Sequence, residues 1–294
     1  MKKTVVGLGE VLWDIFPDYQ RPGGAPANVT YHASVLGNDG TIVSRVGEDA
    51  KGRELEQFLQ GKDLDVSYLQ KDSNHDTGIV KVEFKGDEAK YTIVEEVAWD
   101  YIEFTDRLKK LASKADAVCF GTLAQRSEVS RSTIRKFLEH TTGDCLKILD
   151  VNLREPFYNR EILEYSISAA DVVKLNEQEF EVLQNLLVGD QSENLLEYLL
   201  INQNVKVVCL TKGVDGSELI TKNARFVEPR HQIDTSDGDS VGVGDAFTAA
   251  LTHHMLKSAE LDQALALANR YAAHIAAQKG GMPEVPQVIK ESVR

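Results

Sequence analysis

Short runs of apolar, mostly β-branched residues alternate along this chain with longer segments of helical periodicity. Each run is bounded by turn residues and predicts a buried strand. The runs occupy residues 4–8, 41–46, 117–120, 147–151, 171–175 and 205–210. The helical segments cover residues 27–36, 53–60, 130–140, 177–187, 193–200, 246–257 and 261–278. This alternation predicts an α/β fold, with a doubly wound, mostly parallel sheet flanked by helices.

One stretch departs from the alternation, because residues 78–84 and 91–97 both have a strand pattern. Lys85, Gly86 and Asp87 between them are turn residues, so the pattern predicts a small β-sheet appended to the core. Such a hairpin is either a flap that keeps water from a reacting phosphate or an ordinary surface hairpin. The pattern alone leaves both interpretations open.

Nothing in the sequence marks a boundary between domains. There is no internal repeat, low-complexity tract or proline-rich linker. The last helical segment stops at Gly280, Gly281 and Pro283. We therefore expect residues 1–294 to form one α/β domain.

The charge balance narrows the class of partner. The chain has 46 acidic and 33 basic residues and a formal net charge of −13. This excess disfavours nonspecific binding to the phosphates of a nucleic acid, and a small molecule is the expected partner. An anionic ligand can still bind where backbone amides, a cation and basic side chains outweigh the overall charge.

Cysteines and apolar runs indicate the compartment. Cys119, Cys145 and Cys209 lie far apart and form no CxxC pair, so we expect buried thiols of a reduced protein. No apolar run approaches the roughly 20 residues that span a bilayer, and charge interrupts the amino terminus. No membrane association and a cytoplasmic location are therefore predicted.

The strongest local signal for chemistry is a glycine-rich loop that runs directly into an apolar helix, with the sequence DSVGVGDAF over residues 239–247. Backbone amides of Gly242, Val243 and Gly244 converge at the start of that helix. Unpaired amides and the positive end of the helix dipole form an anion hole that stabilises charge on a transferring phosphoryl group.

Asp245 follows this loop at the mouth of the helix. A carboxylate there can take the proton of a substrate hydroxyl as the hydroxyl attacks a phosphate, which is general-base catalysis. An aspartate at a helix start is also a common N-cap. The loop by itself leaves both roles open.

Further motifs follow the predicted strands in a fixed order. They read GEVLWD at 9–14, GGAPAN at 23–28, DVNLR at 150–154, NEQE at 176–179 and TKGVDG at 211–216. Together with the late glycine loop, they resemble the signatures of the ribokinase-like (PfkB) carbohydrate kinases, and the resemblance covers essentially the whole chain. It implies an enzyme that uses ATP and Mg²⁺ and carries its second, small sheet as a lid.

The resemblance assigns roles to individual side chains. Asp14, Gly24 and Asn28 are expected to hold sugar hydroxyls, and Arg154 is expected to face the sugar or the transferring phosphate. Asn176 and Glu179 match the segment that organises Mg²⁺, through coordinated water, and phosphate. The purely structural alternatives are an N-cap of a helix for Asn176 and a position on a solvated helix face for Glu179.

The resemblance also implies which residues bind the nucleotide and a monovalent cation. Nucleotide contacts are expected from Thr211, Gly213, Gly216 and Asn269, with Asn269 near the adenine. Relatives often bind K⁺ beside the anion hole, and Asp239 with the Val241 carbonyl would be its ligands here. The family usually has Asp-Thr at this point, so residues 234–235 are an alternative to residues 239–240. We prefer Asp239, which leaves residues 234–238 as a polar insert.

The lid is expected to comprise residues 12–24 and 77–104 and, by the resemblance, to pack against a second subunit in a homodimer. Tyr91 and Trp99 lie in it, and hydrophobic packing is the expected role of both. The amino-terminal motifs most resemble bacterial fructokinases, which makes fructose the first candidate substrate. 2-Keto-3-deoxygluconate, ribose, other sugars and nucleosides remain alternatives.

Other classes of protein fit less well. A dinucleotide-binding loop would need a third glycine where Leu12 stands, and no GxxxxGK[ST] segment exists for a P-loop. The pair His253 and His254 has no companion metal ligands in the sequence. A non-catalytic sugar sensor on the same fold remains open, although retention of both Gly244 and Asp245 disfavours it.

Overall fold

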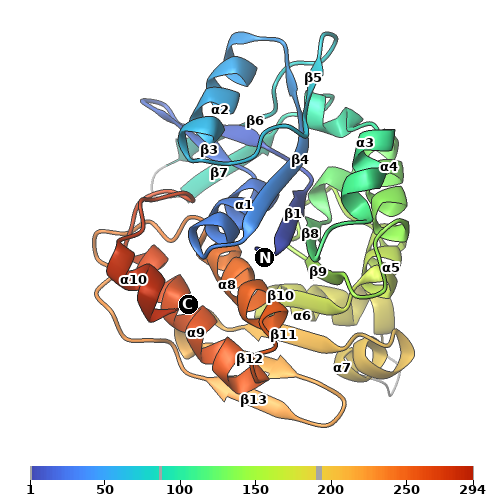
Figure 1. The fold of residues 1–294 in the computed structure, drawn as a ribbon, viewed down its shortest axis with the longest axis vertical. Helices are drawn as coiled ribbons and strands as arrows, with labels where there is room; N and C mark the ends of the chain where they lie inside the picture. The colour runs from blue at the N-terminus through green and yellow to red at the C-terminus, as the bar shows by residue number, and fades with distance from the viewer. Residues whose placement is uncertain (1, 86–87, 190–193, 294) are drawn as a thin grey trace.

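The computed structural model describes residues 2–85, 88–189 and 194–293 and is built around one nine-stranded sheet (Figure 1). The strands from β11 to β5 are all parallel, whereas β12 and β13 add an antiparallel edge. In spatial order they are β13 (Arg225–Glu228), β12 (Ser217–Ile220), β11 (Val207–Thr211), β10 (Val172–Asn176), β9 (Leu146–Asp150), β8 (Ala117–Gly121), β1 (Thr4–Leu8), β4 (Asp39–Gly47) and β5 (Leu69–Asp72). The predicted α/β class and mostly parallel sheet are confirmed.

Helices cover both faces of this sheet. Along β1, Val5 packs into one apolar cluster and Val6 into the other, because successive strand residues point to opposite faces. One cluster involves α1 (Ala25–Val35), α8 (Val243–Leu256), α9 (Leu261–Ala276) and α10 (Gln287–Ser292). The other involves α3 (Asp106–Ala112), α4 (Glu128–Glu139), α5 (Arg160–Ala169), α6 (Glu177–Leu183) and α7 (Leu195–Glu197). Figure 1 shows these two groups on opposite flanks of the strands.

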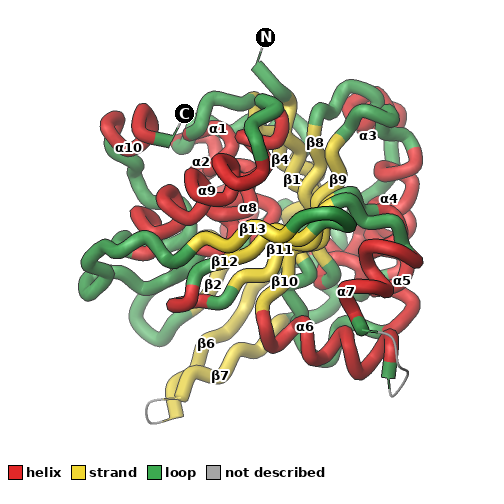
Figure 2. The backbone as a smooth tube through the Cα atoms, turned by 90° about the horizontal axis from the view of Figure 1, so that it is seen from below, coloured by secondary structure: helices red, strands yellow, loops and turns green. Residues whose placement is uncertain are grey.

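A separate four-stranded sheet forms the predicted small β unit, which we call the lid. It consists of β3 (Gln20–Gly23), β2 (Leu12–Ile15), β6 (Ile79–Lys85) and β7 (Glu88–Ile93). Figure 2 shows the β6–β7 hairpin projecting away from the body of the molecule. The hairpin pairs with β2, which directly follows the glutamate of the first motif, so it is part of a sheet joined to the candidate site.

The second strand of the lid hairpin differs from the sequence prediction at both ends, and it begins at Glu88 rather than at residue 91. The second strand ends at Ile93 rather than at residue 97, because Val97 turns into the main core and begins a 3₁₀ turn, Ala98–Tyr101. The predicted turn residues Gly86 and Asp87 lie outside the described residues. The short strands β2, β3, β5, β12 and β13 were not predicted, because each has too few apolar residues to show a period.

Helix boundaries also shift. The predicted helix at 53–60 is α2 (Ala50–Gly61), which Asp49 caps by accepting from Gly52 N. The helix at 177–187 changes to a π-helical turn at Gln184–Val188, and α7 continues as a second such turn at Tyr198–Asn202. Residue 193, the predicted start of α7, lies outside the described residues.

Two further predictions concern burial. Cys119, Cys145 and Cys209 are free and buried, as expected for core thiols. Within residues 2–85, 88–189 and 194–293, no helix has the length and apolar character needed to cross a bilayer.

Candidate active site

The candidate site lies at the carboxyl edge of the central sheet, where parallel strands deliver the residues that follow them to one place. β9 ends at Asp150, β10 ends at Asn176, and β1 leads through Glu10 into the lid strand β2. Helix α8 starts at the same edge, so Asp150 and Asp245 interact electrostatically although they are distant in sequence.

The start of α8 requires glycine. Gly242 is the N-cap and has φ of 72°, in the left-handed region that other residues rarely adopt. A Cβ on Gly242 would stand 2.6 Å from the Cα of Gly281, so the two backbones pack directly against each other. The first-turn amides of Val243 and Gly244 have no partner within a helix, which fits the predicted anion hole.

Asp245 occupies the third position of α8, so the interpretation of this residue as the N-cap is wrong. Its Oδ2 accepts a hydrogen bond of 2.7 Å from Nδ2 of Asn28. Burial and the negative charge of Asp150 raise the pKa of Asp245 to about 6, against the opposing effects of Asn28, Lys174 and Arg154. A carboxylate with this pKa is ionised at neutral pH and is a better proton acceptor than an exposed aspartate.

A buried ion pair lies beneath the anion hole. Nζ of Lys174 lies 3.0 and 2.9 Å from the two carboxylate oxygens of Asp150, and it would be 3.1 Å from a Cβ on Gly244. Burial alone would lower the pKa of Lys174, but Asp150, Asp245 and Glu179 raise it, so the ammonium stays charged. Lys174 was not predicted as a site residue. The feature of the sequence that points to it is a lysine within an otherwise apolar strand.

Glu10 is a second carboxyl close to Asp245. Its side chain is buried, its Oε2 has no hydrogen-bond partner among the described residues, and burial raises its pKa to about 7. The charges of Asp245 and Arg154 act on it in opposite directions. The motif at residues 9–14 contained Glu10, but the sequence assigned it no role.

Three of the predicted sugar-binding residues lie on β2 and at the start of α1, and one of them, Asn28, is bonded to Asp245. Asp14 lies on β2, and burial raises its pKa to about 6, while Arg21 and Arg154 lower it. Gly24 caps α1 with φ of 108°, and a Cβ there would meet the Glu10 carbonyl oxygen at 2.4 Å, so only glycine fits at this position. Arg154 is exposed, and its positive charge lowers the pKa of Asp14 and of Asp245 against the effect of burial.

A hollow of about 410 Å³ opens on the other side of the anion hole. It is lined by the four residues predicted to contact the nucleotide, Thr211, Gly213, Gly216 and Asn269, and also by Asn176 and by Val243 and Gly244 of the predicted anion hole. Asn269 donates 2.6 Å to the hydroxyl of Ser217, which fixes its side chain on the wall. Gly216 has φ of 92°, and a Cβ there would lie 2.1 Å from the Glu228 carbonyl oxygen.

Asn176 and Glu179 form a capping box at the start of α6. Asn176 Oδ1 accepts from Glu179 N at 2.9 Å, and Glu179 Oε2 accepts from Asn176 N at 2.9 Å. Glu179 Oε1 accepts from Leu153 N at 3.0 Å, and its side chain is buried, so the solvated-face reading is wrong. Each carboxylate oxygen keeps a lone pair for a water molecule, which fits an outer-sphere role toward Mg²⁺.

The candidate cation ligands have other partners. Asp239 accepts from Gly280 N with both oxygens at 3.1 Å and from Val241 N at 3.1 Å, and its Oδ2 is paired with Arg21 Nη1. The guanidinium of Arg21 therefore holds a position that a cation bound to Asp239 would need. The alternative residue, Asp234, is exposed and accepts only a local bond from Ser236 N in the described residues.

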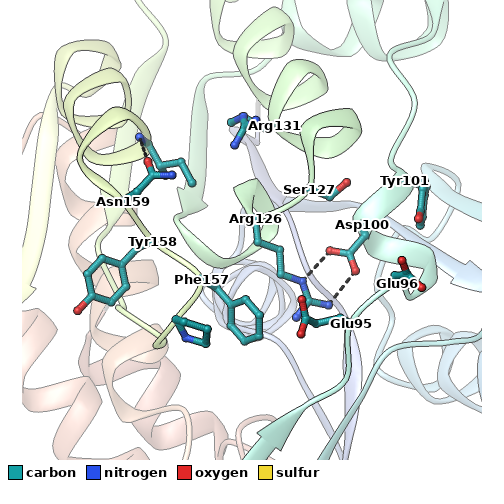
Figure 3. Close-up of a pocket in the computed structure, with 12 residues that line it drawn as sticks. Glu95, Glu96, Asp100, Tyr101, Arg126, Ser127, Arg131, Phe157, Tyr158 and Asn159 are labelled. Carbon is teal, nitrogen blue, oxygen red and sulfur yellow. Dashed lines mark hydrogen bonds and ion pairs between the residues drawn. The ribbon is translucent and has the colours of Figure 1, made fainter.

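A second hollow, of about 350 Å³, adjoins the base of the lid (Figure 3). In it, Arg126 donates 2.8 Å bonds to both oxygens of Asp100 and a 2.6 Å bond to the Val94 carbonyl. Its guanidinium also lies 4.0 Å from the centre of the Trp99 ring. Arg126 thus fixes the segment that joins β7 to the body.

The predicted packing role has a different outcome for each of the two aromatic residues, Trp99 and Tyr91. Trp99 is 1% exposed and packs in the main core, so the predicted packing role is confirmed for it. Tyr91 is 63% exposed, and the packing prediction is wrong for it within one chain. The apolar face of the lid is filled instead by Leu12, Val80 and Val82.

Comparisons with known proteins agree with this geometry. Residues 18–288 match the family model described as pfkB family carbohydrate kinase. A Pyrococcus horikoshii protein named as a sugar kinase is 32% identical over 96% of this chain and 93% of its own length, and its crystal structure superposes with a TM-score of 0.81. The Escherichia coli fructokinase is 27% identical and covers 97% of both chains.

The fold is shared more widely than the sequence. A fructokinase of Xylella fastidiosa, solved with bound ATP, is 20% identical and has a TM-score of 0.87 over all of this chain and 98% of its own. The likeness confirms the ribokinase-like fold. The family match covers nearly all of the sequence, and this chain therefore belongs to the pfkB family of carbohydrate kinases.

Proposed function

We propose that this carbohydrate kinase transfers the γ-phosphate of MgATP to a primary hydroxyl of a sugar, with fructose to fructose 6-phosphate as the first candidate reaction. The observation that carries the proposal is the placement of Asp245. It stands at the start of α8, bonded to Asn28 on the sugar side and next to the nucleotide hollow on the other. A hydroxyl held near Asn28 would face both the carboxylate and the transferring phosphate.

Asp245 acts as the general base in this proposal. It accepts the proton of the hydroxyl while that oxygen attacks phosphorus in line with the departing ADP. The amides of Gly242, Val243 and Gly244 stabilise the negative charge that spreads over the transferring group. Arg154 lies near the same charges and orients the sugar or the phosphate.

The nucleotide lies in the hollow lined by Thr211, Gly213, Gly216 and Asn269 in this proposal. Gly213 and Gly216 let the backbone approach the nucleotide closely, and Asn269 lines the adenine end. Bound Mg²⁺ would neutralise charge on the phosphates, and Asn176 with Glu179 would hold its waters. A monovalent cation at Asp239 and Val241 is not part of this proposal, because the guanidinium of Arg21 is already paired with Asp239.

The sugar hydroxyls are held by Asp14, Gly24 and Asn28. Fructose is supported by the amino-terminal motifs and by relatives named fructokinase, such as that of Escherichia coli. Kinases acting on 2-keto-3-deoxygluconate, ribose or nucleosides share the same site plan, so they stay as alternatives. A non-catalytic sensor is disfavoured because the chain keeps Asp245 at a glycine-rich helix start, where burial raises the pKa of its carboxyl to about 6.

Turnover measured with a set of candidate substrates tests the proposal directly. ADP release from MgATP is measured with fructose, glucose, ribose, 2-keto-3-deoxygluconate and adenosine. We expect fructose to give the highest kcat/KM. Higher turnover with another of these compounds would support the kinase function and identify a different substrate. No ADP release with any of them, together with retained sugar binding, would favour the non-catalytic sensor.

The pH dependence of the reaction is a second expectation. Asp245 must be ionised to act, and its pKa is raised to about 6, so kcat/KM should fall as pH drops through about 6 and level off above it. The profile is recorded with saturating MgATP. An acid limb near the ordinary aspartate pKa of about 4 would show that the base titrates in a solvated environment instead.

Two further predictions concern the location and the assembly of the protein. A cytoplasmic location and a homodimer formed through the lid stay predictions, and the exposed ring of Tyr91 on β7 is a natural contact for the latter. Size-exclusion chromatography with light scattering measures the oligomeric state.

A further inference from the structure

An arginine of the lid reaches the loop that builds the anion hole. Arg21 lies on β3, and its guanidinium pairs with the carboxylate of Asp239, 218 residues away in the sequence. Asp239 in turn accepts from Gly280 N and Val241 N, which come from both segments that pack around Gly242. One ion pair therefore joins the lid to the phosphoryl-transfer loop.

The guanidinium is held in place from several sides. It donates 2.8 Å to the hydroxyl of Tyr19 and lies 4.8 Å from the Tyr19 ring and 5.1 Å from the Phe16 ring. The Arg21 and Asp239 side chains are only 25% and 23% exposed. Aromatic contacts and partial burial make this pair stronger than an exposed surface ion pair.

Arg21 also faces the sugar side of the site. It is the cross-strand partner of Asp14 in the lid, and its charge lowers the pKa of the Asp14 carboxyl, which burial raises. The same cation thus acts on a proposed sugar ligand and on the loop before the anion hole.

The position of Asp239 calls for a positive charge. A bare carboxylate at the approach to an anion hole would repel the phosphates that the hole must bind. The family resemblance supplies a monovalent cation at this point. In this chain Asp239 Oδ2 is already paired with Arg21, so the residues present do not fit a K⁺ ion unless the arginine leaves.

We propose that Arg21 is the built-in cation of this enzyme: its guanidinium replaces the monovalent cation at Asp239 and orders the anion-hole loop. The inference rests on the proposed kinase function, since the loop it orders is the one that binds the transferring phosphate. The enzyme consequently works without K⁺. Arg21 acts through Asp239 and the loop, and is a positioning residue.

Turnover in different salts is the first measurement. Wild type, Arg21→Ala and, as a control on an exposed lid position, Lys81→Ala are assayed in KCl and in choline chloride at matched ionic strength. Wild type and Lys81→Ala should change less than about twofold between the salts, because neither needs a bound cation. Arg21→Ala should lose at least about tenfold in choline, mostly in kcat, and recover part of it in KCl.

Thallium binding is the second measurement and does not depend on turnover. Tl⁺ substitutes for K⁺, and its binding is followed by ²⁰⁵Tl NMR on the same three proteins. Saturable binding is expected for Arg21→Ala only, because removal of the guanidinium frees Asp239. Arg21→Lys, which keeps the charge, should resemble wild type.

Several results of these two experiments would overturn the inference. A wild-type enzyme that requires K⁺ or binds Tl⁺ saturably would overturn the inference, and so would an Arg21→Ala variant that is fully active in choline. An Arg21→Ala variant that neither binds Tl⁺ nor responds to K⁺ would also overturn it. If wild type transfers no phosphate to any sugar, the proposed function fails, while the thallium result still decides whether Arg21 fills the cation position.

Discussion

Replacing Asp245 with Asn should lower kcat by about 10²- to 10⁴-fold and leave the binding of sugar and ATP nearly unchanged. An asparagine keeps the shape of the side chain and a carbonyl oxygen for the bond from Asn28. It has no capacity to take the hydroxyl proton in the transition state. Steady-state kinetics give the change in kcat, and calorimetric titration with the sugar gives the binding.

Asp262→Asn is the matched control. Asp262 also lies in the first turn of a helix, α9, but is exposed and distant in sequence from the site. It should retain wild-type kinetics. If Asp245→Asn kept kcat within about tenfold of wild type, Asp245 would be a binding residue and not the base.

Lys174→Met should lower the free energy of unfolding by about 3–5 kcal/mol. The substitution leaves the Asp150 carboxylate buried without its cation, since the side chains of Lys174 and Asp150 are only 11% and 7% exposed. Thr248, 3.4 Å from Asp150 Oδ2, is too weak a partner to compensate. Urea unfolding of both proteins at neutral pH measures the difference.

A second variant separates charge from packing. In the double variant Asp150→Asn with Lys174→Met, no unpaired charge is left, so much of the lost stability should return. Lys109→Met, at an exposed position of α3, is the surface control and should unfold like wild type. Wild-type stability of Lys174→Met itself would contradict the buried-pair argument.

The same substitution should act on catalysis. Lys174 lowers the pKa of Asp245, so removing it should move the acid limb of kcat/KM above the wild-type value of about 6. The pH profile of Lys174→Met, recorded beside that of wild type, checks this at temperatures where both proteins are folded. An unchanged limb would show that Lys174 supports only the fold.

The sequence by itself determined those features of the molecule that depend on short, local segments. The apolar runs located the buried parallel strands β1, β4, β8, β9, β10 and β11, because a strand covered on both faces is apolar throughout. The glycine loop located Asp245 and the helix start predicted to form an anion hole, since a left-handed backbone before a helix needs glycine. The order of the motifs predicted the nucleotide contacts Thr211, Gly213, Gly216 and Asn269, and the structure places these four residues around one hollow.

Only the tertiary structure decided which distant side chains meet. The pairing of Lys174 with Asp150, the closeness of Glu10 to Asp245, and the reach of Arg21 to Asp239 join segments that share no local pattern. The short lid and edge strands likewise depend on partners far along the chain, as β2 depends on β6. Charges and proton affinities follow burial and neighbours, and these exist only once the chain has folded.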